Sequence, residues 1–348
     1  MVRQPAVSTA AGDGCVSHRH ESARPFDDSL SYSARRTTMT RPFTTRREFI
    51  ARSGAAALAA GFAGHTALEA LAQHGVPQRP IPSTGEMLPV IGLGSSKVVA
   101  QIAENGTEPV ANVLRALVAH GGKLVDTWPR DPANDAGFGS VISQPEFDGK
   151  LFVTTKVDQV GKEAGIKQFR DAQRNYRREV LDLAQIFSLT DLDTHWPSLQ
   201  EWKAEGAARY IGVTVSQDSH HAALEQFMRR ERPDFVQMNY SITERAVEER
   251  LLPFAADRGV AVIINRPFMN GAYFDRLEGK ELPGWAREFG CETWAQFSLK
   301  YILANPHFTC VLTETSNPRH MEENVLTAAG PLPSEAQRQR MRELIATV

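Results

Sequence analysis

Two residues of opposite charge stand at the ends of consecutive β-rich runs. Asp126 ends the run 123–126, and Lys156 directly follows the run 151–155. Parallel strands of a barrel end at one rim, and barrel enzymes carry their chemistry at the carboxyl-terminal rim. The two side chains are therefore candidates for one active site. Taken alone, Asp126 also fits a cap for the following loop, and Lys156 fits a lysine at the surface.

The elements that position these residues alternate between strands and helices. Eight β-rich runs are found at 90–93, 123–126, 151–155, 183–187, 210–215, 235–238, 260–264 and 309–312. Helix-like stretches lie between them, including 110–120, 165–180 and 246–257. This α/β order predicts a (β/α)₈ TIM barrel. An open doubly wound sheet is the alternative, and the lack of G-x-G-x-x-G after the first strand argues against it.

Both ends of the predicted barrel carry extra elements. Residues 81–89, with Ser83-Thr84-Gly85 at the centre, predict a short β-hairpin before the first strand. Ser334 and Gln337 have the spacing of a capping box, which predicts a last helix to about residue 345.

The first 72 residues have the character of a leader. Residues 1–44 are rich in Ser, Thr, Arg and Pro, which predicts disorder, and translation is expected to start at Met39. Residues 45–72 combine Arg46-Arg47, a short Ala- and Gly-rich stretch and Ala70-Leu71-Ala72, which is typical of a twin-arginine signal peptide. Cleavage after Ala72 leaves 348 − 72 = 276 residues for the barrel domain, 73–348.

Composition excludes several classes of protein. The formal net charge is −2, so no bulk field favours nucleic acid, and no nucleic-acid partner is expected. The apolar part of the leader is too short for a membrane span, so no stable span is expected after cleavage. Three cysteines show no metal-ligand spacing, and a helix start near Asp218 explains His220 and His221 better than a metal site does.

Six runs match the motifs of one family in order and spacing. They are residues 87–94, 125–127, 152–156, 209–214, 236–240 and 315–324. In this order they resemble the first, second, third, fifth and sixth strands and the cofactor-phosphate loop of the aldo/keto reductase superfamily. The resemblance covers about residues 81–332. It implies a barrel that binds a nicotinamide cofactor and reduces carbonyl compounds, which requires a hydride donor and a proton donor.

The resemblance assigns the catalytic residues only in part. It places the family's catalytic aspartate at Asp126 and its lysine at Lys156. The family's proton-donating tyrosine falls at Asp131, and its carbonyl-orienting histidine falls at Phe187. A carboxylate is anionic at neutral pH and donates a proton poorly, and a phenyl ring cannot hydrogen-bond a carbonyl. The acid–base chemistry is therefore expected to be weakened.

Several residues could compensate for the two losses. His195 could reach inward from the loop after the fourth strand, although a surface or helix-start histidine is the simpler reading. Tyr240 could supply a phenol, or it could merely pack. Lys156 itself could act as the acid if burial lowered its pKa. Asp131 could instead pair with Lys156, and Trp128 and Phe187 would then line an aromatic pocket.

The resemblance also predicts the cofactor contacts. They fall on Thr214, Gln237, Tyr240, Glu314, Thr315, Ser316, Asn317, Arg319, His320, Glu323 and Asn324. Asn317 followed by Pro318 is a favourable helix start, whose free N–H groups suit a phosphate. Arg319 and His320 favour NADP, whereas the carboxylate of Glu314 repels a 2′-phosphate and favours NAD. The cofactor is therefore expected to be NADP or NAD, with the preference open.

Two functions follow from these features. The first is an exported, extracytoplasmic or periplasmic oxidoreductase that acts on a small carbonyl substrate and has the twin-arginine translocase as a partner. The second is a cofactor-binding or sensing barrel that has lost efficient carbonyl reduction. A barrel with unrelated chemistry is a third hypothesis, because a fold does not fix a function.

Overall fold

The computed structural model describes residues 76–129 and 131–348. The predicted disordered region 1–44, the predicted signal peptide 45–72 and the start at Met39 lie outside the described residues. Within the described part, no helix is long and apolar enough to cross a membrane.

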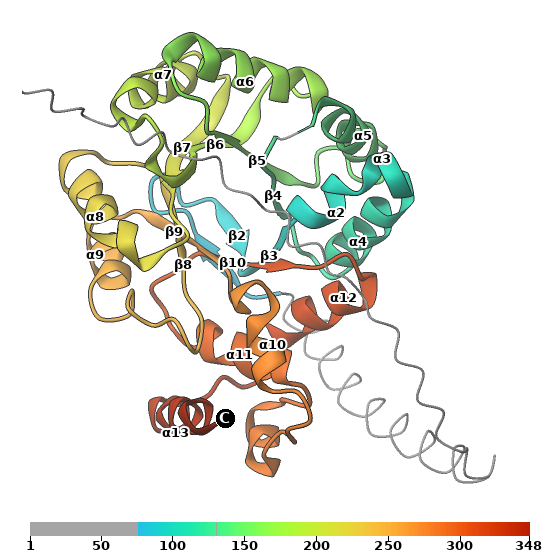
Figure 1. The fold of residues 1–348 in the computed structure, drawn as a ribbon, viewed down its shortest axis with the longest axis vertical. Coiled ribbons are helices and arrows are strands. Elements are labelled where there is room, and N and C mark those ends of the chain that lie inside the picture. The colour runs from blue at the N-terminus through green and yellow to red at the C-terminus, as the bar shows by residue number, and fades with distance from the viewer. Residues whose placement is uncertain (1–75, 130) are drawn as a thin grey trace, which may run out of the picture. The chain divides into compact units, whose positions relative to one another are not determined.

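Eight parallel strands of the described chain close into a barrel, with helices outside it (Figure 1). The order of strands around the barrel is β10-β3-β4-β5-β6-β7-β8-β9, and β9 pairs with β10 to complete the ring. The strands are β3 (Ile91–Gly94), β4 (Leu124–Asp126), β5 (Phe152–Val157), β6 (Leu181–Ile186), β7 (Ala208–Thr214), β8 (Phe235–Asn239), β9 (Ala261–Asn265) and β10 (Cys310–Glu314).

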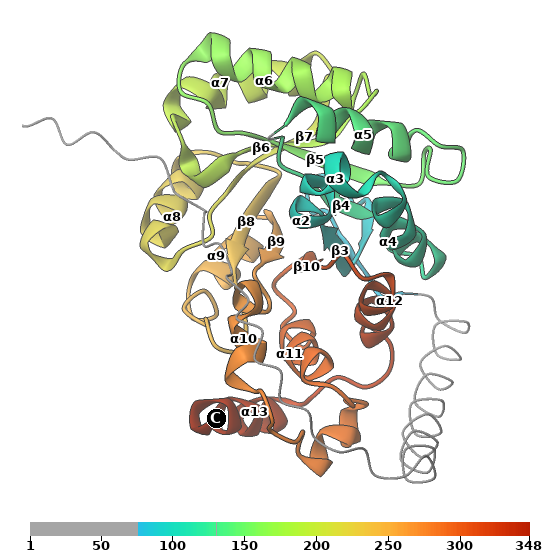
Figure 2. The ribbon, with the colours of Figure 1, turned by 45° about the vertical axis from the view of Figure 1, so that its right-hand side comes forward.

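Helices follow the strands around the ring, and Figure 2 shows the same arrangement turned by 45°. The longer helices are α4 (Glu108–Ala119), α5 (Pro132–Ile142), α6 (Lys162–Asn175), α7 (Leu192–Ala204), α8 (His221–Arg230), α9 (Leu251–Asp257), α11 (Trp294–Leu303), α12 (Pro318–Thr327) and α13 (Glu335–Thr347). Short helices occupy the loops: α2 (Ser96–Ala100), α3 (Ile102–Asn105) and α10 (Ala272–Arg276).

A two-stranded hairpin covers the amino-terminal end of the barrel. Strands β1 (Gln78–Pro80) and β2 (Met87–Pro89) pair antiparallel. Ile81 and Leu88 of this hairpin pack with the inward residues at the base of the barrel, among them Phe152 and Phe235. The Arg79 guanidinium donates to three carbonyl groups between residues 303 and 308, which fixes the hairpin to the loop before β10. The hairpin thus closes the end opposite the candidate site.

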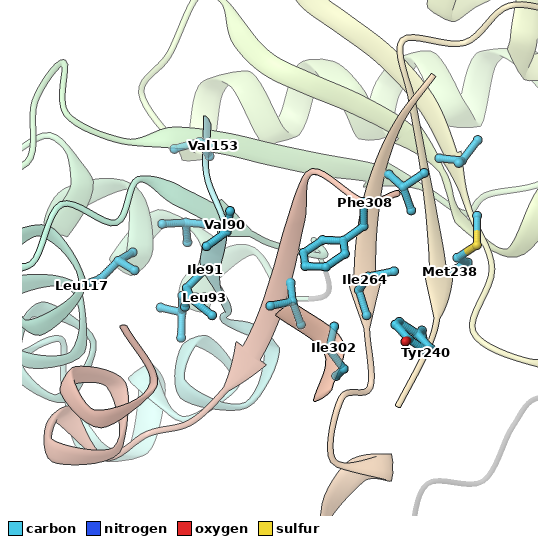
Figure 3. Close-up of a cluster of buried hydrophobic side chains, with 14 of the residues drawn as sticks. Val90, Ile91, Leu93, Leu117, Val153, Met238, Tyr240, Ile264, Ile302 and Phe308 are labelled. Atoms are coloured by element: carbon cyan, nitrogen blue, oxygen red, sulfur yellow. The ribbon is translucent and has the colours of Figure 1, made fainter. Parts of the chain in front are cut away.

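The outward side chains of the strands form a second, larger core beneath the helices. Strand residues alternate between the two sides of the sheet, so every second side chain faces a helix. Figure 3 shows part of this core, including Leu93 of β3, Leu117 of α4 and Ile302 of α11. Each of these three side chains is fully buried. With a core on both of its faces, the barrel holds the ends of its strands in fixed positions.

The predicted architecture is confirmed, with differences at helix ends. The eight strands, the hairpin and the last helix with its Ser334–Gln337 capping box are all present. The helix predicted at 165–180 ends at Asn175, since Arg177 takes a positive φ of 55°. The helix predicted at 246–257 begins only at Leu251. The residues before it form turns, in which the Glu248 carboxylate accepts hydrogen bonds from the hydroxyls of Tyr240 and Tyr301.

Candidate active site

A buried ion pair lies where β4 and β5 end. The Lys156 Nζ is 2.6 Å from Asp126 Oδ2, and the two residues are 5% and 6% exposed. Lys156 also donates to the Thr127 carbonyl oxygen at 2.8 Å, and Asp126 Oδ1 accepts from the Thr154 hydroxyl at 2.7 Å. These contacts compensate for part of the cost of removing two charges from water. The structure thus brings together the two residues whose pairing the sequence predicted.

Two glutamines lie in the barrel interior close to this pair. The Gln237 Nε2 donates to Asp126 Oδ2 at 3.3 Å, and Gln237 Oε1 is buried without a hydrogen-bond partner in the described part of the chain. Gln185 is in register with Lys156 on the neighbouring strand and is fully buried. Neither its Oε1 nor its Nε2 has a partner among the described residues. Buried polar groups are normally satisfied, so these atoms mark a place for a ligand or for water.

Trp128 and Phe187 stack on each other just beyond the ends of two strands. Trp128 lies two positions after Asp126, the last residue of β4, and Phe187 begins the 3₁₀ turn that directly follows β6. Their ring centroids are 4.2 Å apart with an interplanar angle of 22°. The indole N–H of Trp128 donates to Asp158 Oδ2 at 2.8 Å, which fixes the ring. The sequence interpretation placed both rings in an aromatic pocket on the condition that Asp131 pairs with Lys156; the rings stack on each other although Lys156 pairs with Asp126.

The side chain of Asp131 serves the backbone of helix α5. It accepts hydrogen bonds from the N–H groups of Ala133 and Asn134 at 2.9 and 3.0 Å, as an N-cap, and Pro132 occupies the first helical position. The residue is exposed. Lys156 therefore pairs with Asp126, and the alternative pairing with Asp131 is not present.

His195 and Tyr240, the two conceivable substitute acids, are both fully buried. The His195 Nε2 is 2.5 Å from the Gln159 carbonyl oxygen, and its ring packs against Gly165 of α6. The expected place at a helix start is confirmed, since His195 lies in the first turn of α7, but the ring is buried rather than at the surface because it fills the space beside Gly165. The Tyr240 hydroxyl donates to Glu248, and burial raises the pKa of this phenol above its usual value.

A cleft of about 210 Å³ opens beside Asp126. Its wall includes Lys97 after β3, Arg266 and Phe268 after β9, and Glu314 at the end of β10. The Glu314 carboxylate accepts from the Lys97 backbone N–H at 3.2 Å and lies 3.6 Å from its ammonium. Glu314 thus places a carboxylate in the cleft whose charge Lys97 partly offsets.

The predicted phosphate loop follows directly after Glu314. Asn317 caps α12 by accepting from the Arg319 N–H at 3.0 Å, and Pro318 begins the helix, as predicted. Thr315 Oγ1 accepts from the Asn317 N–H at 3.0 Å. Ser316, Arg319, His320 and Glu323 are exposed, whereas Asn324 is buried against the barrel. On the other side of the barrel, Thr214 is buried and its hydroxyl accepts from the Ser188 N–H at 3.3 Å.

Backbone strain concentrates in two loops of the same rim. Seven non-glycine residues in the described ranges have positive φ, and six of them lie after β6 or after β9. These six are Ser188, Leu189, Asp191, Arg266, Met269 and Asn270. Such conformations cost about 1–3 kcal/mol each and cluster at functional sites. None of the six is a glycine, and only Asp191 and Asn270 are of types that adopt a positive φ readily, so this strain could not be predicted from the sequence.

Gln185, Asn265 and Arg266 are rim or interior residues that the sequence prediction missed. Asn265 Oδ1 and Arg266 Nε are buried atoms without partners among the described residues. Gln185 could have been found from the sequence, because it is the polar residue among the alternate positions 183, 185 and 187, of which Leu183 and Phe187 are apolar. No group of three or more His, Cys, Asp or Glu in residues 76–129 and 131–348 is placed to hold a metal ion.

The closed barrel and the Lys156–Asp126 pair at its rim indicate the class of protein. The family model of the aldo/keto reductase family matches residues 90–345, so the chain belongs to this family. A curated relative, the NADH-specific methylglyoxal reductase of Escherichia coli K12, is 26% identical over 212 residues. That match covers 48% of this chain and 63% of the relative, so the chain spans less than two thirds of the relative's length.

Solved structures share the fold of this chain. An aldo/keto reductase of Klebsiella pneumoniae in complex with NADPH has a TM-score of 0.64 at 20% identity, over 75% of this chain and 92% of its own. An aldo-keto reductase of Bacillus halodurans has a TM-score of 0.62 at 19% identity, over 77% and 96%. A glycerol dehydrogenase of Gluconobacter oxydans has a TM-score of 0.62 at 17% identity, over 78% and 95%. At these identities the likeness concerns the fold.

Proposed function

We propose that this protein is an NAD(P)-dependent oxidoreductase that interconverts a carbonyl group and an alcohol in a small substrate, with weakened acid–base catalysis. The observation that carries the proposal is the buried 2.6 Å contact between Lys156 and Asp126 at the carboxyl-terminal rim of the barrel. Chemistry in this fold takes place at that rim. The names of two relatives, an NADH-specific reductase and a reductase bound to NADPH, support the choice of cofactor.

The residues present fit a nicotinamide cofactor. The unpartnered Gln237 Oε1 can accept a hydrogen bond from a carboxamide N–H, and Asn265, whose Oδ1 is likewise unpartnered among the described residues, lines the cleft that Asp126 borders. The N-terminus of α12, capped by Asn317, offers N–H groups to a phosphate. When bound, the cofactor supplies the hydride. The protein would contribute the orientation of the carboxamide through Gln237 and the exclusion of water by the stacked Trp128 and Phe187.

Proton donation is the weak part of this site. All five tyrosines in the described part of the chain are at most 3% exposed, and each hydroxyl has a hydrogen-bond partner. They are Tyr176, Tyr210, Tyr240, Tyr273 and Tyr301. Lys156 donates to Asp126 and to the Thr127 carbonyl, and its third N–H is the group that we propose as the proton donor. Positioned proton transfer contributes about 10²–10⁴-fold to rate, so aldehyde reduction is expected to be slow.

The experiment that tests this function is a fluorescence titration of the purified protein with NADPH and NADH, followed by turnover of a simple aldehyde. If one cofactor binds and is oxidised slowly, and only in the presence of the protein, the result supports an oxidoreductase. Binding without turnover supports the second function, a cofactor-binding barrel without efficient reduction. That second function is favoured by the capping role of Asp131 and the stacking of Phe187. Binding of neither cofactor would refute both.

Glu314 is the residue proposed to decide between the two cofactors. Its carboxylate lies in the cleft, balanced by Lys97, and would repel a 2′-phosphate near the α12 loop. Glu314→Lys is expected to strengthen NADPH binding relative to NADH by about 1–2 kcal/mol, the scale of one charge-assisted contact. Glu314→Gln is the matched control and should give part of this change. An unaltered ratio of the two dissociation constants in both variants would show that the phosphate lies elsewhere.

Export through the twin-arginine translocase to the periplasm is proposed from Arg46-Arg47 and the small-residue site 70–72. Replacing both arginines by lysine is expected to retain the protein in the cytoplasm, as fractionation would show. Unchanged export in a strain without this translocase would refute the proposal. Start of translation at Met39 is proposed as well, and it fails if an uncleaved precursor yields peptides from residues 1–38.

A further inference from the structure

We propose that Tyr176, at the end of α6, is a positioning residue that fixes the direction of the third N–H of Lys156. It acts through Thr127, whose hydroxyl contacts the phenol and whose carbonyl oxygen accepts from Lys156. The value of this position for catalysis rests on the proposed function, in which that N–H is the proton donor. The contacts that carry the inference involve neither the cleft nor the predicted cofactor residues.

Two threonine hydroxyls join the ends of β4 and β5 at the rim. The backbone register pairs residues 124 and 125 with 152 and 153, short of these two side chains. Thr127 Oγ1 donates to the Thr154 carbonyl oxygen at 2.8 Å, and the Thr154 hydroxyl donates to Asp126 Oδ1 at 2.7 Å. Side chains therefore hold the two strand ends together beyond their paired backbone.

Tyr176 is the donor in its contact with Thr127. A hydroxyl has one proton to donate, and Thr127 gives its own to the Thr154 carbonyl, which can only accept. The 2.8 Å contact between Thr127 Oγ1 and the Tyr176 hydroxyl must therefore use the proton of the tyrosine. Burial and the Asp135 carboxylate raise the pKa of Tyr176, so the phenol keeps this proton at neutral pH. Thr127 Oγ1 is thus held from two sides.

The packing of α5 against α6 fixes the position of Tyr176 itself. The residue is fully buried, and its ring meets Phe138 edge-on, with centroids 5.3 Å apart at 84°. A Cβ on Gly139 would lie 1.9 Å from the Asn175 carbonyl oxygen, so only glycine permits this close approach. Arg177, directly after Tyr176, has the one positive φ among the seven described non-glycine values that lies outside the two strained rim loops. Such strain persists only where the surrounding structure over-determines it.

Thr127 matters because its carbonyl oxygen is the second acceptor of Lys156. The ammonium donates to Asp126 Oδ2 at 2.6 Å and to this carbonyl at 2.8 Å. An ammonium has three N–H groups in tetrahedral arrangement, so two fixed acceptors leave one direction for the third. If Thr127 shifts, that direction is no longer defined. General acid catalysis depends on the placement of the donated proton, so Tyr176 should affect the rate without touching the substrate.

Exchange of the Lys156 ammonium protons with water tests this arrangement without any cofactor. The rate is measured by nitrogen-15 NMR of the lysine side chains, and Lys156→Arg assigns the signal by its loss. Tyr176→Phe removes only the hydroxyl and is expected to raise the rate about 2- to 10-fold, the range for the loss of one hydrogen bond. The matched control, Tyr210→Phe, deletes a hydroxyl bonded to Glu86 at the opposite end of the barrel and should leave the rate unchanged.

A double-variant cycle tests whether Tyr176 acts through Thr127. Thr127→Val removes the hydroxyl and keeps both the carbonyl group and the shape of the side chain. In this background Tyr176→Phe should have no further effect on the exchange rate, because the contact is already lost. Thr127→Ser keeps the hydroxyl and should retain the native rate.

Turnover connects the arrangement to catalysis. Oxidation of NADPH or NADH is followed with 4-nitrobenzaldehyde as the acceptor, after subtraction of the protein-free rate. Tyr176→Phe is expected to lower kcat about 2- to 10-fold and to leave KM and the cofactor Kd unchanged, since it alters no residue of the cleft. Tyr210→Phe should change none of these quantities.

Three results would overturn the inference: an unchanged exchange rate in Tyr176→Phe, an equal rise in Tyr210→Phe, or additive effects of Tyr176→Phe and Thr127→Val. Faster exchange with an unchanged kcat, in a protein that turns over, would overturn the positioning role in catalysis. A native protein that binds neither cofactor would refute the proposed function, and the exchange rates would still decide whether Tyr176 holds Lys156 through Thr127.

Discussion

Replacing one member of the Lys156–Asp126 pair is expected to destabilise the protein more than replacing both. The pair is almost fully buried, so removal of one partner leaves an isolated charge, at a cost of about 3–5 kcal/mol. Asp126→Leu should lie at the upper end, because the ammonium then keeps only the Thr127 carbonyl. Lys156→Met should lie at the lower end, because the carboxylate keeps the Thr154 hydroxyl and the Gln237 amide.

The double variant removes both charges and should cost less than either single one. It leaves the Thr154 hydroxyl and the Thr127 carbonyl without their charged partners, at about 1 kcal/mol each, and the Gln237 amide without its longer 3.3 Å contact, at less than this. The expected destabilisation is therefore about 2–3 kcal/mol, and with single effects of about 3 and 5 kcal/mol the coupling energy from the cycle is about 5–6 kcal/mol. Urea denaturation at pH 7 measures all four proteins, and an unchanged m-value is required for the comparison.

The control for this cycle is the exposed pair Lys167–Asp171 on α6, with N–O at 2.6 Å and side-chain exposures of 76% and 28%. Its coupling energy should be under about 0.5 kcal/mol, because water screens it. The reasoning fails if the effects of Asp126→Leu and Lys156→Met on the free energy of unfolding are additive and as small as those in the Lys167–Asp171 pair. That result would mean that solvent reaches Lys156 and that the pair is not held in a low-dielectric interior.

Three further expectations concern residues away from the pair, each measured by urea denaturation. Burial lowers the pKa of Lys300 to about 8 from 10.5, so the unfolded chain holds more protons between these values. The difference in the free energy of unfolding between the native protein and Lys300→Met should then rise with pH between about 8 and 10, by up to about 3 kcal/mol in favour of the native protein. A fall of this difference with pH would contradict the prediction. Gln185→Leu should stabilise by about 1–2 kcal/mol by removing unpartnered buried atoms, and a loss would show that bound water satisfies them. Arg79→Met should cost about 2–3 kcal/mol through its lost carbonyl contacts, and a neutral result would show that the hairpin is not fixed by them.

The fold could be predicted because its signals are local and repeated. Each strand alternates between inward and outward side chains that are both buried, as the six buried residues of β5 show. Lys156 follows a predicted strand and Asp126 ends the one before it, so the parallel register brings them together. The helix ends were less predictable, because they depend on contacts such as that of Glu248 with Tyr240 and Tyr301, which join distant segments.

The environment of the pair could be predicted only in part. The cap formed by Asp131 had a signal in the sequence, since an Asp followed by Pro is a typical helix start. The stacking of Trp128 on Phe187 had no strand pattern behind it, because both residues lie beyond the ends of β4 and β6. The burial of His195 had no local signal, because it depends on Gly165 of the neighbouring helix. The positive φ values of Leu189 and Arg266 had none either, since bulky residues seldom adopt them.

All four positions compared with the family's catalytic set have a local structural role in this chain. Asp126 and Lys156 neutralise each other inside the barrel, Asp131 caps α5, and Phe187 stacks on Trp128. A tyrosine at position 131 would give up a cap worth about 1 kcal/mol, and a histidine at position 187 would weaken the stack. The present residues therefore form a self-consistent rim rather than a damaged one.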